Sequence, residues 1–266
     1  MRLAALQFDI AWEQKQVNFS RIEIMLQWAA TAGSHLCVLP EMFACGFSMN
    51  AAMLAESETG PTLSFMRDQA ALHKMWICGS LPHRPSIQNR THSGKNDSPR
   101  KPFNTLFFVG PSGECVHYHK IHPFSYAKEH LHYQAGDSWT SLEIEGTRIT
   151  PFICYDLRFA NEFWATTEHT DLYIVVANWP RARREHWKTL LQARAIENQA
   201  YVVGVNRVGT GGNLDYSGDS MAIDPTGQIL TSAQEQETML LVEISAETVE
   251  QTRTQFPFLP DRRRLR

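Results

Sequence analysis

Apolar runs of strand length alternate along the chain with segments of helical periodicity, and this alternation restricts the fold more than any other feature of the sequence. The run at Leu172–Asn178 is almost continuously apolar, as in strands whose two faces are both covered. Other strands are predicted at Leu3–Ile10, His35–Leu39, Met75–Leu81, Asn104–Val109, Cys115–His119, Thr147–Ile153, Tyr201–Asn206, Ser220–Ile223 and Met239–Ile244. Helices are predicted at Val17–Ala30, Pro61–His73, Arg183–Asn198 and Ala246–Thr254. Both halves of the chain carry the alternation, which indicates an α/β sandwich with sheets inside and helices outside.

Composition and charge are those of an ordinary globular protein. The 266 residues are 43% hydrophobic and 20% charged, and no linker separates two cores, so we expect one domain spanning residues 1–266. A net charge of −3 argues against binding to nucleic acid or to a membrane surface. The basic cluster Asp261–Arg266 fits a solvated tail or a subunit contact. The polar segment Arg84–Pro102 is predicted to be a long mobile loop without a chemical role.

The cysteines indicate a reducing compartment. The sequence contains five cysteines, and an odd number does not suggest a disulfide framework. The N-terminus begins with a strand-like run instead of a leader, and no apolar stretch is long enough to cross a bilayer. We therefore expect a cytoplasmic protein.

The stretch Pro151–Phe159 presents a thiol at a strand end. An apolar approach stops at Cys154, and a charged, aromatic segment that resembles the start of a helix follows directly. Backbone N–H groups at such a junction are unused, and the positive helix end favours a thiolate and a developing oxyanion. The alternative is that Cys154 is a buried small hydrophobe, as most free cysteines are.

Glu41, Lys120 and Cys154 each follow a predicted strand. Since α/β folds gather functional groups at the carboxyl ends of strands, we expect these three residues to converge. A carboxylate near a thiol accepts its proton, while a nearby ammonium lowers the thiol pKa and binds a carbonyl oxygen that becomes negative. The backbone N–H of Tyr155 is the natural second donor to that oxygen. Taken singly, Glu41 also fits a helix cap and Lys120 a solvated strand end.

Three short blocks of the sequence resemble the signature blocks of the nitrilase superfamily of carbon–nitrogen hydrolases in order and spacing. They are Pro40-Glu41-Met42-Phe43, His119-Lys120-Ile121 and Cys154-Tyr155-Asp156-Leu157-Arg158-Phe159. The resemblance runs from Leu3 almost to the end of the chain. It implies a four-layer αββα sandwich that forms a homodimer, with Glu41 as base, Lys120 as oxyanion-binding cation and Cys154 as nucleophile. It also implies a second carboxylate beside the lysine, for which Glu129 is the best match. Glu129 would either orient Lys120 or assist proton transfer, and a simple ion pair is the alternative to both roles.

Within this superfamily, three further stretches are similar to the omega-amidase branch: Ala177-Asn178-Trp179-Pro180 with Arg183, His186-Trp187, and the helix from Gln192 to Gln199. That branch hydrolyses the terminal amide of 2-oxo-dicarboxylic acid monoamides such as 2-oxoglutaramate and 2-oxosuccinamate. The substrate carboxylate requires a cation, which Arg183 supplies in this interpretation, although Arg183 also fits surface charge at a helix start. Phe124, Tyr126 and Trp179 are expected to contact the carbon chain, or else to belong to the core.

The expected reaction is a double displacement through a cysteine thioester, with ammonia as the first product and no cofactor. A nucleotide is not implied because the phosphate-binding Gly-x-x-x-x-Gly-Lys-Ser/Thr loop is missing from the sequence. A metal is not implied either, since His117, His119 and His122 are split across a strand end. The alternatives are another amidase or N-carbamoyl hydrolase of the superfamily, a thiol redox module built on Cys154, and a non-catalytic binding protein.

Overall fold

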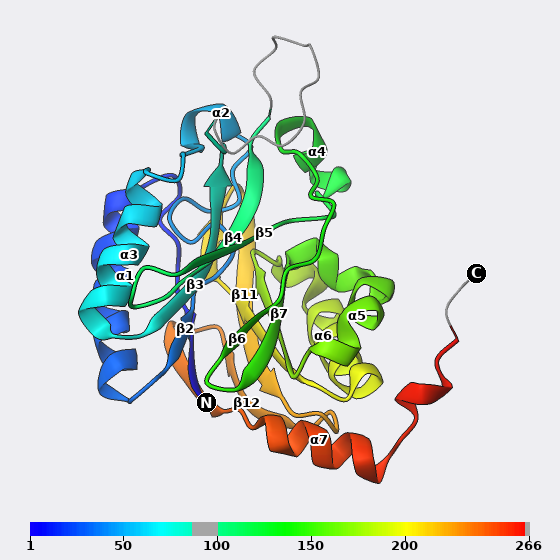
Figure 1. The fold of residues 1–266 in the computed structure, drawn as a ribbon. Coiled ribbons are helices and arrows are strands. Elements are labelled where there is room, and N and C mark those ends of the chain that lie inside the picture. Colours follow the sequence, from blue (N-terminus) through cyan, green and yellow to red (C-terminus); the bar gives the residue numbers. More distant parts are fainter. Residues whose placement is uncertain (87–100, 264–266) are drawn as a thin grey trace.

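The predicted strands assemble into two mixed sheets in the computed structural model (Figure 1), which describes residues 1–86 and 101–263. The first sheet has the order β13 (Thr238–Glu243), β1 (Arg2–Gln7), β2 (Leu36–Val38), β3 (Trp76–His83), β4 (Phe103–Val109), β5 (Cys115–His119). The second has the order β10 (Val208–Gly211), β11 (Leu214–Ile223), β9 (Tyr201–Asn206), β8 (Leu172–Ala177), β7 (Thr147–Ile153), β6 (Leu142–Ile144). Strand β12 (Ile229–Gln234) pairs with β11 outside this order.

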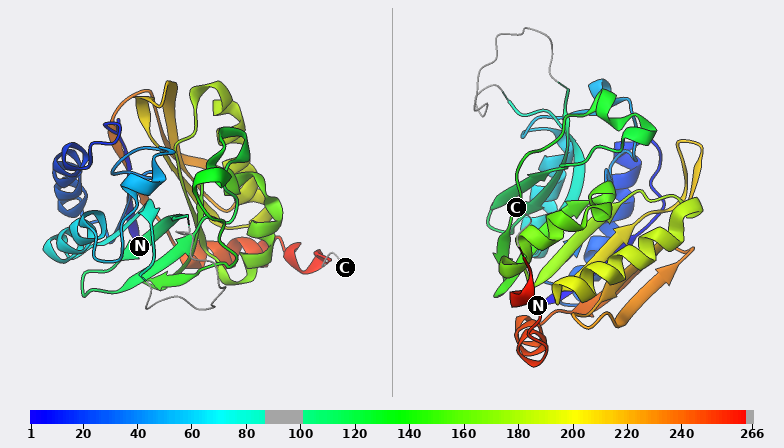
Figure 2. Two further views of the ribbon diagram at one scale, coloured as in Figure 1. Left: turned by 90° about the horizontal axis from the view of Figure 1, so that it is seen from above. Right: turned by 90° about the vertical axis from the view of Figure 1, so that its right-hand side faces the viewer.

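Helices cover the outer face of each sheet, as Figure 2 shows in the view from above. Helices α1 (Lys15–Thr31) and α3 (Pro61–His73) flank the first sheet, and α5 (Ala160–Thr166) and α6 (Arg184–Asn198) flank the second. Helix α7 (Ala246–Gln255) lies at one end of the sandwich, and α2 (Ala51–Leu54) and α4 (Glu129–His132) are single turns. The α/β class with helices outside two sheets is therefore confirmed.

The sequence explains where α1 and α3 form. The buried residues Phe19, Ile22 and Leu26 of α1 recur at helical spacing and pack toward the sheet. Helix α3 begins at Pro61, whose missing N–H is not needed in a first turn. It ends at His73, and the next residue, Lys74, caps it with a left-handed φ of 51°. Within the described ranges, none of the helices is long and apolar enough to cross a membrane.

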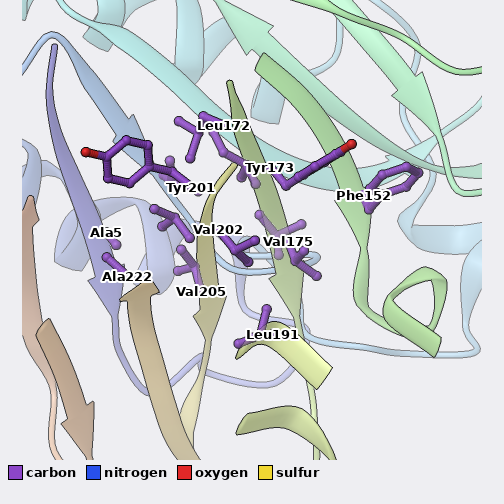
Figure 3. Packing of buried hydrophobic residues seen from close by; sticks show 14 of the residues in the cluster. Ala5, Phe152, Leu172, Tyr173, Val175, Leu191, Tyr201, Val202, Val205 and Ala222 are labelled. Carbon is purple, nitrogen blue, oxygen red and sulfur yellow. The ribbon is translucent and has the colours of Figure 1, made fainter. Parts of the chain in front are cut away.

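The main core lies between the two sheets. Along β1, Leu3 and Ala5 join this inner core, whereas Ala4 and Leu6 face α1 and α3 in a second, outer core. Figure 3 shows this cluster around β8 and β9, including Leu191 of α6, which packs on the outer face of the second sheet against Gly204. Strand β8 is buried along its whole length and is apolar throughout, as predicted for the run Leu172–Asn178.

Some expected boundaries are wrong. Strand β1 ends at Gln7 instead of Ile10, since Gln7 is the last residue that pairs with β13. Phe8 and Ile10 lie beyond the strand, but their side chains still belong to the outer core. Strands β6, β10 and β12 were not predicted, and β11 begins at Leu214 instead of Ser220. Helix α6 and the other long helices begin and end within a few residues of their predicted bounds. Most of the predicted loop Arg84–Pro102 lies outside the described residues, as does the end of the basic cluster Asp261–Arg266.

Candidate active site

Four strands bring polar residues to one place between the sheets. Strands β2 and β3 are parallel, and β4 is antiparallel to both β3 and β5, so β2 and β5 end at the same edge of the first sheet. Glu41 follows β2 at this edge, and Lys120 follows β5. In the second sheet β7 and β8 run parallel; Cys154 follows β7 and Asn178 follows β8. The two edges meet, since Asn178 N donates a hydrogen bond of 2.8 Å to Glu41 Oε2. The structure thus brings the three predicted residues together.

The Glu41 carboxylate is fixed through both of its oxygens. Oε1 accepts hydrogen bonds from Lys120 Nζ at 2.9 Å and from Asn104 Nδ2 at 2.8 Å, while Oε2 accepts from the backbone of Asn178. Glu41 is completely buried, and the Cys154 thiol lies within hydrogen-bonding reach of it. A carboxylate held in this way can accept a proton from sulfur without first reorganising.

Lys120 lies between two carboxylates. Its Nζ is 2.9 Å from Glu129 Oε2 and 3.2 Å from Glu129 Oε1, in addition to its bond to Glu41. Burial lowers the pKa of Lys120, but Glu129 and Glu41 more than offset this, so the net pKa is raised and the group is an ammonium. Burial raises the pKa of Glu129. The ammonium of Lys120 opposes this increase, whereas the negative charge of the nearby Glu41 carboxylate adds to it.

Contacts on all sides fix Glu129. It lies at the start of α4, is fully buried, and accepts a short hydrogen bond from the backbone N–H of Phe124 and a longer one, 3.3 Å, from Asn104 Nδ2. Both of its oxygens are therefore occupied by donors. This geometry suits a residue that orients Lys120.

The turn that carries Cys154 is held by a neighbouring carboxylate. Cys154 has a left-handed φ of 47°, an uncommon conformation for a residue with a side chain. Asp156, two residues on, is fully buried and accepts hydrogen bonds from Ile153 N at 3.0 Å, Tyr118 Oη at 2.8 Å and His122 N at 2.8 Å. These bonds tie the turn to β5 and to the loop that follows it.

The structure corrects the expected state of the thiol. The segment Cys154–Arg158 is a 3₁₀ turn, and the α-helix begins only at Ala160, so no long helix dipole points at the sulfur. Burial raises the pKa of Cys154 well above its usual value, and Glu41 adds to this shift while Lys120 opposes it. The free site therefore contains a protonated thiol beside a base, instead of a preformed thiolate.

A cavity of about 350 Å³ opens on Cys154. Its wall is mostly aromatic and apolar, and the predicted residues Phe124, Tyr155, Trp179 and Arg183 contribute to it. The expected position of Tyr126 is wrong: its side chain is 84% exposed, it is not part of the cavity wall, and its ring packs against the ring of Phe124 at 5.8 Å.

Sequence reasoning missed three polar residues of the site. Asn104 and Asn178 hold Glu41, and Arg158 lines the cavity with its guanidinium carbon 4.8 Å from the ring centroid of Trp179. Arg158 stands four residues after Cys154 in the same signature block, and Asn178 precedes Trp179, so the signal was present but not assigned a role. Within residues 1–86 and 101–263, the His, Cys, Asp and Glu side chains form no group of three suited to a metal.

Comparison with known proteins agrees with this geometry. The family model of carbon–nitrogen hydrolases matches residues 2–254, and the chain therefore belongs to the carbon–nitrogen hydrolase family. It is an amidase of the nitrilase superfamily and acts on small amides.

Individual relatives cover nearly the whole chain. The omega-amidase YafV of Yersinia enterocolitica is 38% identical over 264 residues, with 98% of this chain and 96% of the relative covered. The 2-oxoglutaramate amidase of Bacillus subtilis strain 168 is 30% identical over 267 residues, with 98% and 97% covered. The present chain also superposes on the crystal structure of XC1258 from Xanthomonas campestris, a CN-hydrolase superfamily protein with an arsenic adduct in its active site. The TM-score is 0.90 at 37% identity, and the match covers 100% of this chain and 98% of the XC1258 chain.

Proposed function

We propose that this protein is an omega-amidase, which hydrolyses the terminal amide of 2-oxo-dicarboxylic acid monoamides such as 2-oxoglutaramate and 2-oxosuccinamate. The observation that carries the proposal is the cavity itself: it joins Cys154, beside a buried base and ammonium, to a wall that contains Arg158 and Arg183. An amide enters at the thiol, and the carboxylate at the far end of the substrate pairs with guanidinium. The names of the relatives support the same substrate class.

In the proposed first half-reaction, Glu41 takes the thiol proton as the sulfur of Cys154 attacks the amide carbon. Lys120 and the backbone N–H of Tyr155 bind the oxygen that becomes negative. The C–N bond then breaks, Glu41 returns the proton to the leaving nitrogen, and ammonia departs. The acyl group remains on sulfur as a thioester.

In the second half-reaction, water attacks the thioester. Glu41 accepts a proton from this water, the C–S bond breaks, and the proton returns to the thiolate. The products are the dicarboxylic acid and the free Cys154 thiol. In this scheme Glu129 acts as the residue that orients Lys120, because Lys120 and the backbone of Phe124 occupy its oxygens.

The test is ammonia release from 2-oxoglutaramate, from glutamine and from a simple aliphatic amide. We expect the oxo-amide to be the preferred substrate and Cys154→Ala to be inactive. Cys115→Ala is the matched control, because Cys115 is an exposed cysteine at the start of β5. A preference for the aliphatic amide or for N-carbamoyl compounds would instead place the enzyme elsewhere in the superfamily.

We also propose that the enzyme is cytoplasmic and works as a homodimer. The five free cysteines fit a reducing compartment. The exposed apolar side chains Trp164, Phe256 and Phe258 support a subunit contact near α5 and the C-terminal end. Light scattering of the purified protein tests the dimer, and a monomer mass at micromolar concentration would refute it.

A further inference from the structure

The hairpin of β10 and β11 supplies one part of the cavity wall. Gly212, Leu214 and Tyr216 from this hairpin line the cavity, together with Trp12 from the loop after β1. The indole of Trp12 packs so closely on the hairpin that a Cβ atom at Gly212 would lie 2.7 Å from it. This part of the wall is therefore tightly packed, and its side chains have little freedom to move.

Tyr216 carries a hydroxyl that the protein itself does not use. The residue is only 2% exposed and lines the cavity, yet its oxygen makes no hydrogen bond to any residue in the described part of the chain. The oxygen is not among the side-chain atoms closed off from solvent without a partner, and Tyr216 lines the cavity, so a molecule bound in the cavity can supply the partner of this hydroxyl.

The hydroxyl is a neutral donor. Burial raises the pKa of Tyr216 to about 12, with Arg207 opposing this shift and Glu41 and Cys154 adding to it. At neutral pH the group is a phenol that can donate to an acceptor on a bound molecule. Tyr216, Cys154 and Arg183 line the same cavity, so a molecule bound at the thiol also lies within the space that Tyr216 borders.

Arg207 holds the ring of Tyr216 in place. Its guanidinium carbon is 4.6 Å from the ring centroid, and the side chain is completely buried. Arg207 Nη2 donates to Asp9 Oδ1 at 2.5 Å, to the carbonyl oxygen of Ile10 at 3.1 Å and to that of Thr210 at 2.8 Å. Because the arginine is bound both to the segment after β1 and to strand β10, the tyrosine ring that it contacts is preorganised.

We propose that the Tyr216 hydroxyl donates a hydrogen bond to the 2-oxo oxygen of the substrate and so selects 2-oxo amides over amides without the ketone. This inference rests on the proposed omega-amidase function. The substrate carboxylate is expected to pair with the charged, planar guanidinium groups of Arg158 and Arg183. The neutral phenol of Tyr216 then remains as the donor for the neutral 2-oxo carbonyl of the substrate. An analogue without the ketone leaves the buried donor unpaired, and a site built for a hydrogen bond rejects such analogues strongly.

The experiment compares two substrates in Tyr216→Phe, which removes only the hydroxyl oxygen. The substrates are 2-oxoglutaramate and glutaramate, the monoamide of glutaric acid, which has the same length and carboxylate but lacks the ketone. We expect kcat/KM for 2-oxoglutaramate to fall roughly 10- to 100-fold, with a change of less than about twofold for glutaramate.

Tyr201→Phe is the matched control. Tyr201 is also a buried tyrosine whose hydroxyl has no hydrogen bond to the described residues, but it lies at the first residue of β9, the end of the strand remote from the site. Its kinetics should equal those of the wild type for both substrates.

Two results would overturn the inference while leaving the proposed function intact: an equal loss for both substrates in Tyr216→Phe, or no loss for either substrate. A wild-type enzyme without any preference for 2-oxoglutaramate would overturn the proposed function itself, and the inference with it. That failure is visible in the wild type before any variant is made.

Discussion

Arg158 and Arg183 each rest on an aromatic ring at the cavity wall. Arg158 lies over Trp179, and the guanidinium carbon of Arg183 is 5.5 Å from the ring centroid of Phe124. Arg158 also contacts His186 Nδ1 through Nη2 at 3.2 Å. Stacking holds a guanidinium in a plane while its N–H groups stay available at the edge, an arrangement that suits a carboxylate.

We therefore expect Arg158→Met to discriminate between charged and neutral substrates. For 2-oxoglutaramate, kcat/KM should fall roughly 10- to 100-fold, because a charged hydrogen bond contributes about 1.5 to 3 kcal/mol. For a neutral aliphatic amide it should stay within about twofold of wild type. Arg181→Met, outside the cavity and paired with Glu235, is the control. Equal losses for both substrates would show that Arg158 does not bind the carboxylate.

The residues that could be predicted from the sequence are those with local signatures. Glu41, Lys120 and Cys154 each follow a strand whose end is visible in the apolar pattern. Tyr216 has no such signature, because its place is set by Arg207 and by the packing of the hairpin on Trp12. Tyr126 was misplaced for the converse reason: an aromatic residue beside Phe124 suggests a wall, but the turn directs it to solvent.

At the scale of elements, the turn after β7 depends on Asp156. This carboxylate satisfies backbone N–H groups of Ile153 and His122 and the hydroxyl of Tyr118, all at or near the site. Asp156→Ala would leave these donors without their partner and would release the left-handed conformation of Cys154.

The expected cost of Asp156→Ala is roughly 3 kcal/mol in the free energy of unfolding, with a large loss of kcat. Tyr118→Phe removes only one of the bonds and should cost about 1 kcal/mol. Urea denaturation and ammonia release measure the two effects. If Asp156→Ala were as stable and as active as the wild type, the turn would be held by other contacts.

The ribbon of β3, β4 and β5 contains two neutral histidines. His83 and His119 both contact Thr105 Oγ1 through Nδ1, at 3.4 Å and 2.8 Å, and His119 also stacks on Phe103 with ring centroids 4.1 Å apart. Burial lowers the pKa of each to about 4. In the unfolded chain the same groups titrate near 6.5, so the unfolded state binds more protons below that pH.

Stability should therefore fall as pH decreases from about 6.5 toward about 4, and should change little from these groups above that window. His119→Phe keeps the ring stacked on Phe103 and removes one titrating group, so the decline should be shallower. Urea midpoints across this range provide the measurement. An identical pH dependence in the variant and the wild type would exclude His119 as a contributor.

Edge strands are where prediction from sequence failed. In β12, a single residue, Ala233, is buried, so the segment shows no alternation of apolar and polar residues. Its conformation comes from pairing with β11 across the short turn at 224–228, an interaction that the residues of β12 alone do not reveal. Central strands such as β8 are buried on both faces, and their composition alone identifies them.

At the scale of the whole molecule, the inner core joins the two halves of the chain. Val38 and Leu106 of the first sheet belong to the same cluster as Ile153 and Val176 of the second. Neither sheet can therefore lose its partner without exposing its inner face, which predicts that residues 1–266 unfold as one domain.

Tryptophan fluorescence and far-ultraviolet circular dichroism should then report the same urea transition. Tryptophans lie in both halves, for example Trp76 in β3 and Trp187 in α6, so fluorescence follows both sheets. Two separated transitions would contradict a single domain and indicate that the sheets unfold independently.

The most direct test of the central claim is the mass of the intact protein, quenched with acid during turnover of 2-oxoglutaramate. We predict an adduct equal to the substrate minus ammonia, located on the peptide that contains Cys154 and not formed by Cys154→Ala. Its appearance would establish a thioester formed by attack of this thiol. Full ammonia release by Cys154→Ala, or an adduct on a different residue, would contradict the account.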